Sequence, residues 1–241
     1  MIALSLLLGA AFRLPLLSRL PNGLSIDEAG AGYDAYSILQ TGRDQFGERL
    51  PLLPRNTARL HCLDIYMMVP FLALLGPVEL AVRLPLALVG LATVVLTYVY
   101  ARENHGESTG CAAALLVAVS PWHVLLSRHG AIWNTLPACA TLALLLWVRF
   151  LRSGRSWAAA GLATGAAFYS YAPIRGLLPL LLLGLAAFQV RELKQRWRGV
   201  ATACAIAGVM ALPLLWHGFT EQGRERFEKV ADSQAPSELA R

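Results

Sequence analysis

Long apolar runs, separated by short polar connections, occupy almost the whole chain. A helix that crosses a bilayer needs about 20 mostly apolar residues, and residues 78–101 reach this length as one Leu- and Ala-rich run. We predict seven membrane-spanning helices, over residues 1–17, 78–101, 109–120 with their flanks, 132–148, 157–171, 174–190 and 200–216. The first run lacks a positively charged start and a clear small-residue cleavage site, so we interpret it as a retained helix rather than a signal peptide.

Residues 18–77 form a long loop between the first two predicted spans. Its segment 63–75 is apolar, but it is only thirteen residues long and contains Pro70, which suits an interfacial or re-entrant helix better than a span. The polar stretch 25–51 holds five of the fifteen acids of the chain: Asp27, Glu28, Asp34, Asp44 and Glu48. Carboxylates gathered at a membrane surface reflect either solvent exposure or chemistry, and both interpretations are kept here.

The composition favours a polytopic membrane protein of the all-α class. The 241 residues are 56% hydrophobic and 15% charged, whereas soluble domains are about 45–50% apolar and about 25% charged. Lipid leaves backbone polar groups to be satisfied internally, which favours helices, and the continuous apolar runs differ from the alternating strands of a membrane barrel. We predict one transmembrane domain over residues 1–217, followed by a polar tail over 218–241.

Basic residues give the chain a formal net charge of +6. Because they lie between apolar runs, we attribute them to topology and anionic lipid and expect no nucleic-acid partner. Dense positive charge at span ends marks the cytoplasmic side. We therefore predict a multi-pass protein of the inner (plasma) membrane, with a cytoplasmic N-terminus and with the acidic loop facing the periplasm or exterior. The cations of the predicted inner connections are Arg102, Arg149, Arg152, Arg155, Arg191, Lys194, Arg196 and Arg198.

Four arginines in apolar surroundings converge on the predicted outer leaflet: Arg13, Arg83, Arg128 and Arg175. Ionisable residues at membrane depth are candidates for function, and a planar guanidinium binds phosphate through two donors. We predict that at least one of the four contacts phosphate. They are otherwise snorkelling anchors, or ion-pair partners of Asp27 and Glu28.

Asp27 and Glu28 directly follow the first span, at a membrane surface with cations opposite. A carboxylate in that position suits a general base for an acceptor hydroxyl, although acidic pairs are more often solvated loop residues. Tyr169 and Tyr171 are candidates to line a lipid or sugar site or, alternatively, members of the interfacial aromatic belt. The four cysteines show no CxxC spacing, so the sequence supports neither a zinc site nor a disulfide framework.

Four stretches resemble a known family when taken in order: FRLPLLSRLPNGLSIDEAGAGYDAYSILQTGRDQFGERLP, MMVPFLALLGPVELAVRLPLALVG, VSPWHVLLSRHG and FYSYAPIRGLLP. They resemble bacterial lipid-carrier-dependent glycosyltransferases, which are the dolichyl-phosphate-mannose protein mannosyltransferase-like (family 39) members of the GT-C superfamily. The resemblance runs from Arg13 to Pro179 and continues weakly in the tail. Such relatives are about twice as long, so we expect this chain to correspond to an N-terminal portion.

The resemblance implies transfer of a sugar from a polyprenyl-phosphate carrier to a protein, lipid or glycan hydroxyl, with inversion at the anomeric carbon. It implies that Asp27 is the catalytic base and Glu28 its support, and that Arg128 and Arg175 bind the carrier phosphate. Many relatives carry a Lys-Pro-Pro-like element where this chain has Arg59 to Asp64. Asp34, His61 and Asp64 are further candidates to line the substrate site, with His61 alternatively an interfacial polar residue. No cofactor is implied with certainty, and a divalent metal remains open.

Two other classes of function are compatible with the sequence. The first is a transporter or flippase, which needs ionisable groups along a path through the midplane, whereas charges here gather toward one face. The second is a truncated, inactive homologue or a structural membrane subunit, which the length of the chain alone suggests.

Overall fold

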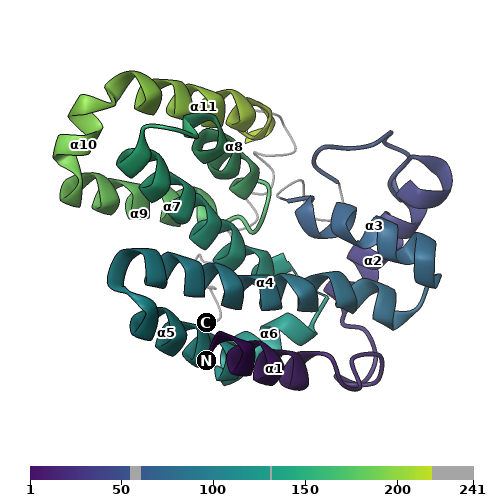
Figure 1. The fold of residues 1–241 in the computed structure, drawn as a ribbon. Coiled ribbons are helices and arrows are strands. Elements are labelled where there is room, and N and C mark those ends of the chain that lie inside the picture. The colour runs from purple at the N-terminus through teal and green to yellow at the C-terminus, as the bar shows by residue number, and fades with distance from the viewer. Residues whose placement is uncertain (55–60, 131, 219–241) are drawn as a thin grey trace, which may run out of the picture.

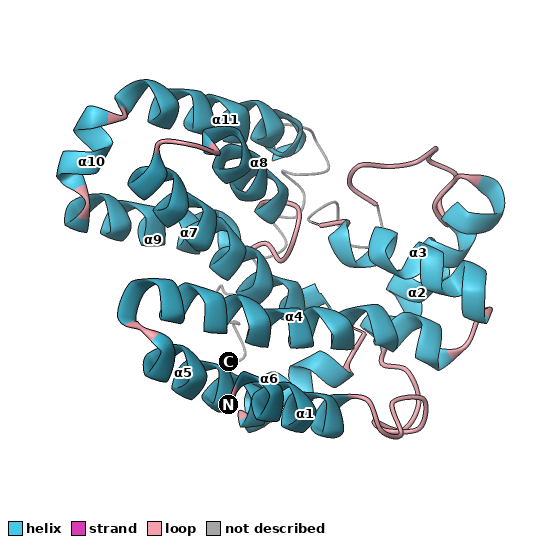
Figure 2. Ribbon diagram, viewed as in Figure 1, coloured by secondary structure: helices cyan, strands magenta, loops and turns pink. Residues whose placement is uncertain are grey.

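The computed structural model describes residues 1–54, 61–130 and 132–218, and in this part of the chain every regular element is a helix (Figure 2). This confirms the predicted all-α class. The predicted polar tail lies outside the described residues from position 219 onward.

The first half of the chain is arranged around one long helix, α4 (Glu79–His105). α1 (Ile2–Arg13), α5 (Glu107–Val119) and α6 (Pro121–Arg128) pack along one side of it. α2 (Ile26–Thr41) and α3 (Leu63–Leu75) lie at its N-terminal end (Figure 1). Ala35, Ile65 and Leu86 belong to the apolar core that joins these last two helices to α4.

The second half is arranged around α7 (Thr135–Ser153), which follows the short helix η1 (Ile132–Asn134) and packs on α4. α8 (Trp157–Ala167) lies between α7 and α11 (Trp197–Gly218) and contacts both. α9 (Ile174–Phe188) and the short α10 (Val190–Gln195) complete this half (Figure 1).

The described residues contain three helices that are long and apolar enough to cross a membrane: α4, α7 and residues 197–216 of α11. α5 and α6 together form a fourth if they are one span bent by 57°. The other predicted spans are shorter helices, with 12 residues in α1, 11 in α8 and 15 in α9. All seven predicted runs are helical, but by length and composition the structure supports three or four spans.

The long loop predicted over residues 18–77 contains two helices. α3 has the predicted bounds, whereas α2 occupies most of the polar stretch that holds the acids. The candidate residues of this loop therefore lie on or beside two helices, α2 near its start and α3 near its end.

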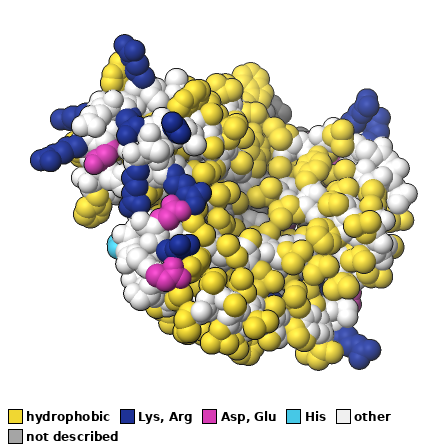
Figure 3. Space-filling view, viewed as in Figure 1, with side chains coloured by type: hydrophobic (Ala, Val, Ile, Leu, Met, Phe, Trp, Pro, Cys, Tyr) yellow, Lys and Arg dark blue, Asp and Glu magenta, His cyan; other side chains and the backbone are white. Residues whose placement is uncertain are grey.

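Charged side chains are concentrated at one end of the molecule (Figure 3). There the α4–α5 and α7–α8 turns and α10 meet, and Arg149 pairs with Glu103 while Arg102 pairs with Glu107. Most of the rest of this face is hydrophobic (Figure 3). The acid-bearing helix α2 lies at the other end of α4 (Figure 1).

Candidate active site

The N-terminus of α2 is fixed by a reciprocal cap between Ser25 and Glu28. The backbone N–H of Glu28 donates to Ser25 Oγ at 3.2 Å, and the backbone N–H of Ser25 donates to Glu28 Oε2 at 2.8 Å. Two N–H groups that a helix start leaves without partners are thereby satisfied. The cap determines where α2 begins and which way its first turn faces.

Asp27 lies in this first turn, and its side chain is exposed. Within the described chain its carboxylate forms neither a hydrogen bond nor an ion pair. The partial positive charge at a helix N-terminus favours a carboxylate at this position. The geometry therefore presents one solvent-facing carboxylate on a helix whose start is held rigidly.

Glu28 points the other way and is only 1% exposed. Its Oε1 accepts from Arg83 Nε at 2.8 Å and from the backbone N–H of Gly130 at 2.8 Å. Burial raises the pKa of this carboxyl, but the hydrogen bonds from Arg83, Ser25 and Gly130 outweigh it and hold the pKa below its usual value. Glu28 is thus a buried anion that ties α2 to α4 and to the segment after α6.

Arg83 is fully buried, and it serves the backbone as well as Glu28. One terminal nitrogen donates to the carbonyls of Leu17 at 3.2 Å and Pro21 at 2.9 Å. The other donates to the carbonyl of Gly23 and to Glu28 Oε2. With Nε on Glu28, these five hydrogen bonds match the five N–H groups of a guanidinium.

Arg13 is equally buried and equally saturated. Its guanidinium reaches the C-terminal end of α5, where a helix leaves carbonyls without partners. Its five contacts are with the carbonyls of Gly9, Val117 and Ala118, with Ser127 Oγ and with His123 Nδ1.

Arg128, at the end of α6, binds the end of α1 and the turn that follows it. It donates to the carbonyls of Phe12 and Arg13, at 2.9 and 3.1 Å, at the end of α1. It also donates to the carbonyls of Pro15 and Leu20, at 2.9 and 3.1 Å. Arg83 and Arg128 therefore hold the turn between α1 and α2, whereas Arg13 ties α1 to the junction of α5 and α6. A phosphate would have to displace backbone carbonyls at Arg13, Arg83 and Arg128.

Arg175 lies in the first turn of α9, where its Nε donates to the carbonyl of Phe168 at 3.1 Å. In the same α8–α9 segment, the carbonyl of Tyr169 accepts from the N–H groups of Cys62 at 3.2 Å and Leu63 at 3.3 Å. This segment consequently lies against the start of α3.

The two predicted tyrosines have different surroundings. Tyr169 is buried, and its hydroxyl donates to the carbonyl of Met210 in α11 at 2.6 Å. Tyr171 meets Trp133 edge to face, with ring centroids 6.5 Å apart. Both rings are engaged by the protein, which makes Tyr169 a structural link between α11 and α3.

The remaining candidates lie on the two helices of the long loop. Asp34 is buried in α2 and accepts from the backbone N–H of Gln45 at 3.1 Å, which holds the chain that follows the helix. His61 Nδ1 lies 3.1 Å from Asp64 Oδ1 at the start of α3, and Asp64 is only 1% exposed. His61 and Asp64 thus share one end of α3 with the Tyr169–Arg175 segment.

Sequence reasoning missed Ser25 and Gly130 as partners of the acidic pair. The S-x-x-E spacing of Ser25 and Glu28 is a readable cap signature, whereas nothing in the sequence indicates the Gly130 amide. In the described part of the chain, no group of three or more His, Cys, Asp or Glu side chains is placed to hold a metal ion.

A family model described as dolichyl-phosphate-mannose-protein mannosyltransferase matches residues 63–217, more than half of the chain. The chain belongs to this mannosyltransferase family. Membership confirms the predicted resemblance and makes the protein a membrane glycosyltransferase of a type that uses a lipid-linked sugar. No curated protein and no solved structure matches the chain.

The matched range divides the predicted site of this mannosyltransferase family member. Six of the predicted site residues lie inside it: Asp64, Arg83, Arg128, Tyr169, Tyr171 and Arg175. The other five precede it: Arg13, Asp27, Glu28, Asp34 and His61. Their proposed roles rest on the geometry described above and on the sequence resemblance.

Proposed function

We propose that this protein transfers a sugar from a polyprenyl-phosphate carrier to an acceptor hydroxyl at the outer face of the membrane, with Asp27 as the general base. The observation that carries the proposal is the exposed Asp27 carboxylate on the first turn of a helix held by the buried Glu28–Arg83 pair. Membership of the mannosyltransferase family supplies the class of reaction.

The proposed step is a single inverting displacement. Asp27 accepts the proton of the acceptor hydroxyl while the hydroxyl oxygen attacks the anomeric carbon from the face opposite the phosphate. The new glycosidic bond forms as the bond from the anomeric carbon to the phosphate oxygen breaks, and polyprenyl phosphate leaves with that electron pair. A positioned general base contributes about 10²- to 10⁴-fold to such a rate.

The departing phosphate gains negative charge, which a nearby guanidinium stabilises. We assign this contact to Arg128 and Arg175, which lie in the sequence stretches that carry the family resemblance. His61 and Asp64 lie at the end of α3 that meets the Arg175 segment, and they are the proposed lining of the sugar site.

The proposed place of the reaction follows from the charge distribution. Cations concentrate at the end of α4 that is remote from α2 (Figures 1 and 3), and positive charge at span ends favours the cytoplasmic side. The acidic helix would then face the periplasm or exterior, where lipid carriers present their sugars to secreted acceptors.

The test is a reconstituted transfer assay. Purified protein in liposomes receives polyprenyl-phosphate hexoses, mannose first because the family description names it, with membrane extract as the source of acceptors. We expect labelled sugar to move into the acceptor fraction, with release of an equal amount of polyprenyl phosphate and inversion at the anomeric carbon. Movement of intact donor across the bilayer without cleavage would instead support a flippase and contradict the proposal.

A further inference from the structure

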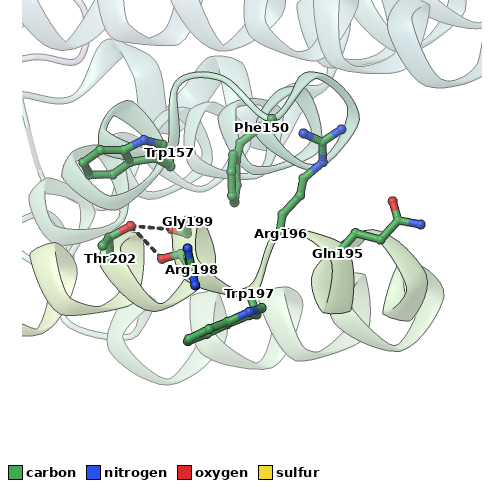
Figure 4. A pocket seen from close by; sticks show the side chains of 9 residues that line it. Phe150, Trp157, Gln195, Arg196, Trp197, Arg198, Gly199 and Thr202 are labelled. Carbon is green, nitrogen blue, oxygen red and sulfur yellow. Dashed lines mark hydrogen bonds between the residues drawn. The ribbon is translucent and has the colours of Figure 1, made fainter.

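A cavity of about 590 Å³ lies at the charged end of the molecule, far along α4 from the candidate active site. It is formed by the C-terminal end of α7, the first residue of α8 and the start of α11 (Figure 4). The rings of Phe150, Trp157 and Trp197 border it, together with the side chains of Arg196 and Arg198. Its volume is typical of sites for small molecules.

Arg196 is held against the end of α7 with donors to spare. One terminal nitrogen donates to the carbonyl of Arg152 at 3.0 Å, whereas Nε is buried and has no partner in the described chain. Its guanidinium occupies the space beside Gly154, where any side chain would collide with it and where the backbone φ of +74° favours glycine. A buried donor without a partner is costly in a folded protein.

The residues that line the cavity carry a net positive charge. No carboxylate is among the residues that line it. The nearby acids Glu103 and Glu107 are paired with Arg149 and Arg102 instead. Arg198 lies over the ring of Trp197, with 5.6 Å between guanidinium carbon and ring centroid, and remains exposed.

The position of the cavity relative to the apolar helices points to lipid. Among the described residues, α7 and residues 197–216 of α11 are two of the three helices that are long and apolar enough to cross a membrane. A helix of 20 residues is about 30 Å long, which is close to the hydrocarbon thickness of a bilayer. Trp197 and Trp216 stand at its two ends, 62% and 77% exposed, as is typical of indole rings at the two membrane–water interfaces.

We propose that this cavity binds the phosphate of an anionic phospholipid head group in the leaflet next to the charged end. Arg196 and Arg198 contact the phosphate, and the rings of Trp157 and Trp197 lie at the level of the lipid glycerol. The bound lipid anchors the starts of α8 and α11 to the end of α7. This site is separate from the proposed carrier site at the other end of α4.

The test uses the whole protein in phosphatidylcholine nanodiscs that contain a minority of phosphatidylglycerol. Native mass spectrometry counts the phosphatidylglycerol molecules that stay bound. The Arg196→Gln/Arg198→Gln variant is compared with Arg102→Gln/Arg149→Gln, which removes the same charge at the same end but outside the cavity. We expect a drop of roughly tenfold or more in phosphatidylglycerol affinity for the first variant alone, since each basic residue near an anionic surface contributes about 1 kcal/mol.

The single variant Arg198→Gln keeps the experiment informative if the double variant unfolds, because this exposed side chain packs into no core. It should lower the affinity by a smaller factor. Equal losses of phosphatidylglycerol affinity in both double variants would show that only the total charge of this end matters. Unchanged affinity in the Arg196→Gln/Arg198→Gln variant would show that the cavity is not a lipid site. Displacement of the lipid by inorganic phosphate would assign the cavity to a soluble phosphate, and each of these results overturns the proposal.

Discussion

Glu28 and Arg83 place opposite charges in the interior, at the point where α2, α4 and the segment after α6 meet. Glu28 is 1% exposed and Arg83 is 0% exposed, so both side chains have lost their hydration. Each charge is therefore stabilised by the opposite charge of the other. In the proposed mechanism the pair acts indirectly: it positions the helix turn that carries Asp27, and Asp27 meets the acceptor.

The two members of the pair are predicted to be coupled, so that the costs of removing each one do not add. Arg83→Met or Glu28→Gln alone leaves a buried group without its partner, which costs about 3–5 kcal/mol. The double variant Glu28→Gln/Arg83→Met should be less destabilised than the sum of the two single variants. The free energy of unfolding in mixed detergent micelles measures this coupling.

The exposed pair of Arg149 and Glu103 provides the control for that cycle. Arg149→Gln should change the free energy of unfolding little, because solvent-exposed ion pairs contribute little. If Arg149→Gln were as damaging as Arg83→Met, or if the double variant showed simple additivity, the burial argument would be wrong.

At the scale of the residue, the sequence offered an ion pair between one of the arginines and Glu28, which Arg83 forms, but it did not predict the other hydrogen-bond partners of these side chains. Arg13 and Ser127 are hydrogen-bonded across 114 positions of the chain, and Arg83 binds carbonyls whose positions depend on the turn after α1. Such contacts arise only after the helices pack. Short-range signals such as the Ser25–Glu28 spacing are readable, because both partners belong to one helix turn.

Among the elements, α8 and α11 pack through a pair of glycines. Gly161 and Gly165 are four residues apart in α8, which is the small-residue spacing that lets membrane helices approach closely. A Cβ at Gly161 would lie 2.6 Å from the carbonyl oxygen of Ala203 in α11. Since that contact is with backbone, a side-chain movement cannot relieve it.

We predict that Gly161→Ala separates the two helices and lowers the free energy of unfolding by about 1–3 kcal/mol, as overpacking does. Gly184→Ala in α9 is the matched control, because nothing lies within 4 Å of the added carbon. That variant should be neutral or up to about 1 kcal/mol more stable through helix propensity. Equal effects of the two substitutions in mixed detergent micelles would disprove this packing argument.

Element boundaries were predictable where one physical signal dominated. α3 and α9 coincide closely with their apolar runs, because the one charged residue of each, Asp64 and Arg175, lies in the first turn. α2 was not predicted, since Gly30 and Gly32 weaken its helix signal and Gly32 instead allows close approach to Val82. The bend between α5 and α6 is marked by Pro121, which disfavours helical backbone in the residue before it.

On the scale of the whole molecule, the acidic helix and the cationic connections lie at opposite ends of α4 (Figures 1 and 3). This separation of charge could be predicted from the sequence, because the basic residues near the ends of apolar runs are visible there and such residues bias the orientation of a membrane protein. The number of spans was less predictable, since hydropathy alone does not distinguish a helix of 11 or 15 residues from one that crosses the membrane.

The orientation is testable with single cysteines in a background that lacks Cys62, Cys111, Cys139 and Cys204. A membrane-impermeant maleimide should label Tyr33→Cys, exposed on α2, in intact spheroplasts. Arg155→Cys, in the α7–α8 turn, should react only after lysis. Labelling of Arg155→Cys in intact spheroplasts would reverse the proposed topology.

The central claim is that Asp27 removes the acceptor proton, and the transfer rate of Asp27→Asn tests it most directly. The Asp27 side chain is exposed and forms neither a hydrogen bond nor an ion pair in the described chain. This variant should therefore insert into the membrane and lose no more than about 1 kcal/mol of stability, from the helix N-terminus. Its transfer rate should fall by about 100-fold or more, whereas Glu192→Gln, on the distant α10, should keep the full rate. A full rate for Asp27→Asn would contradict the account.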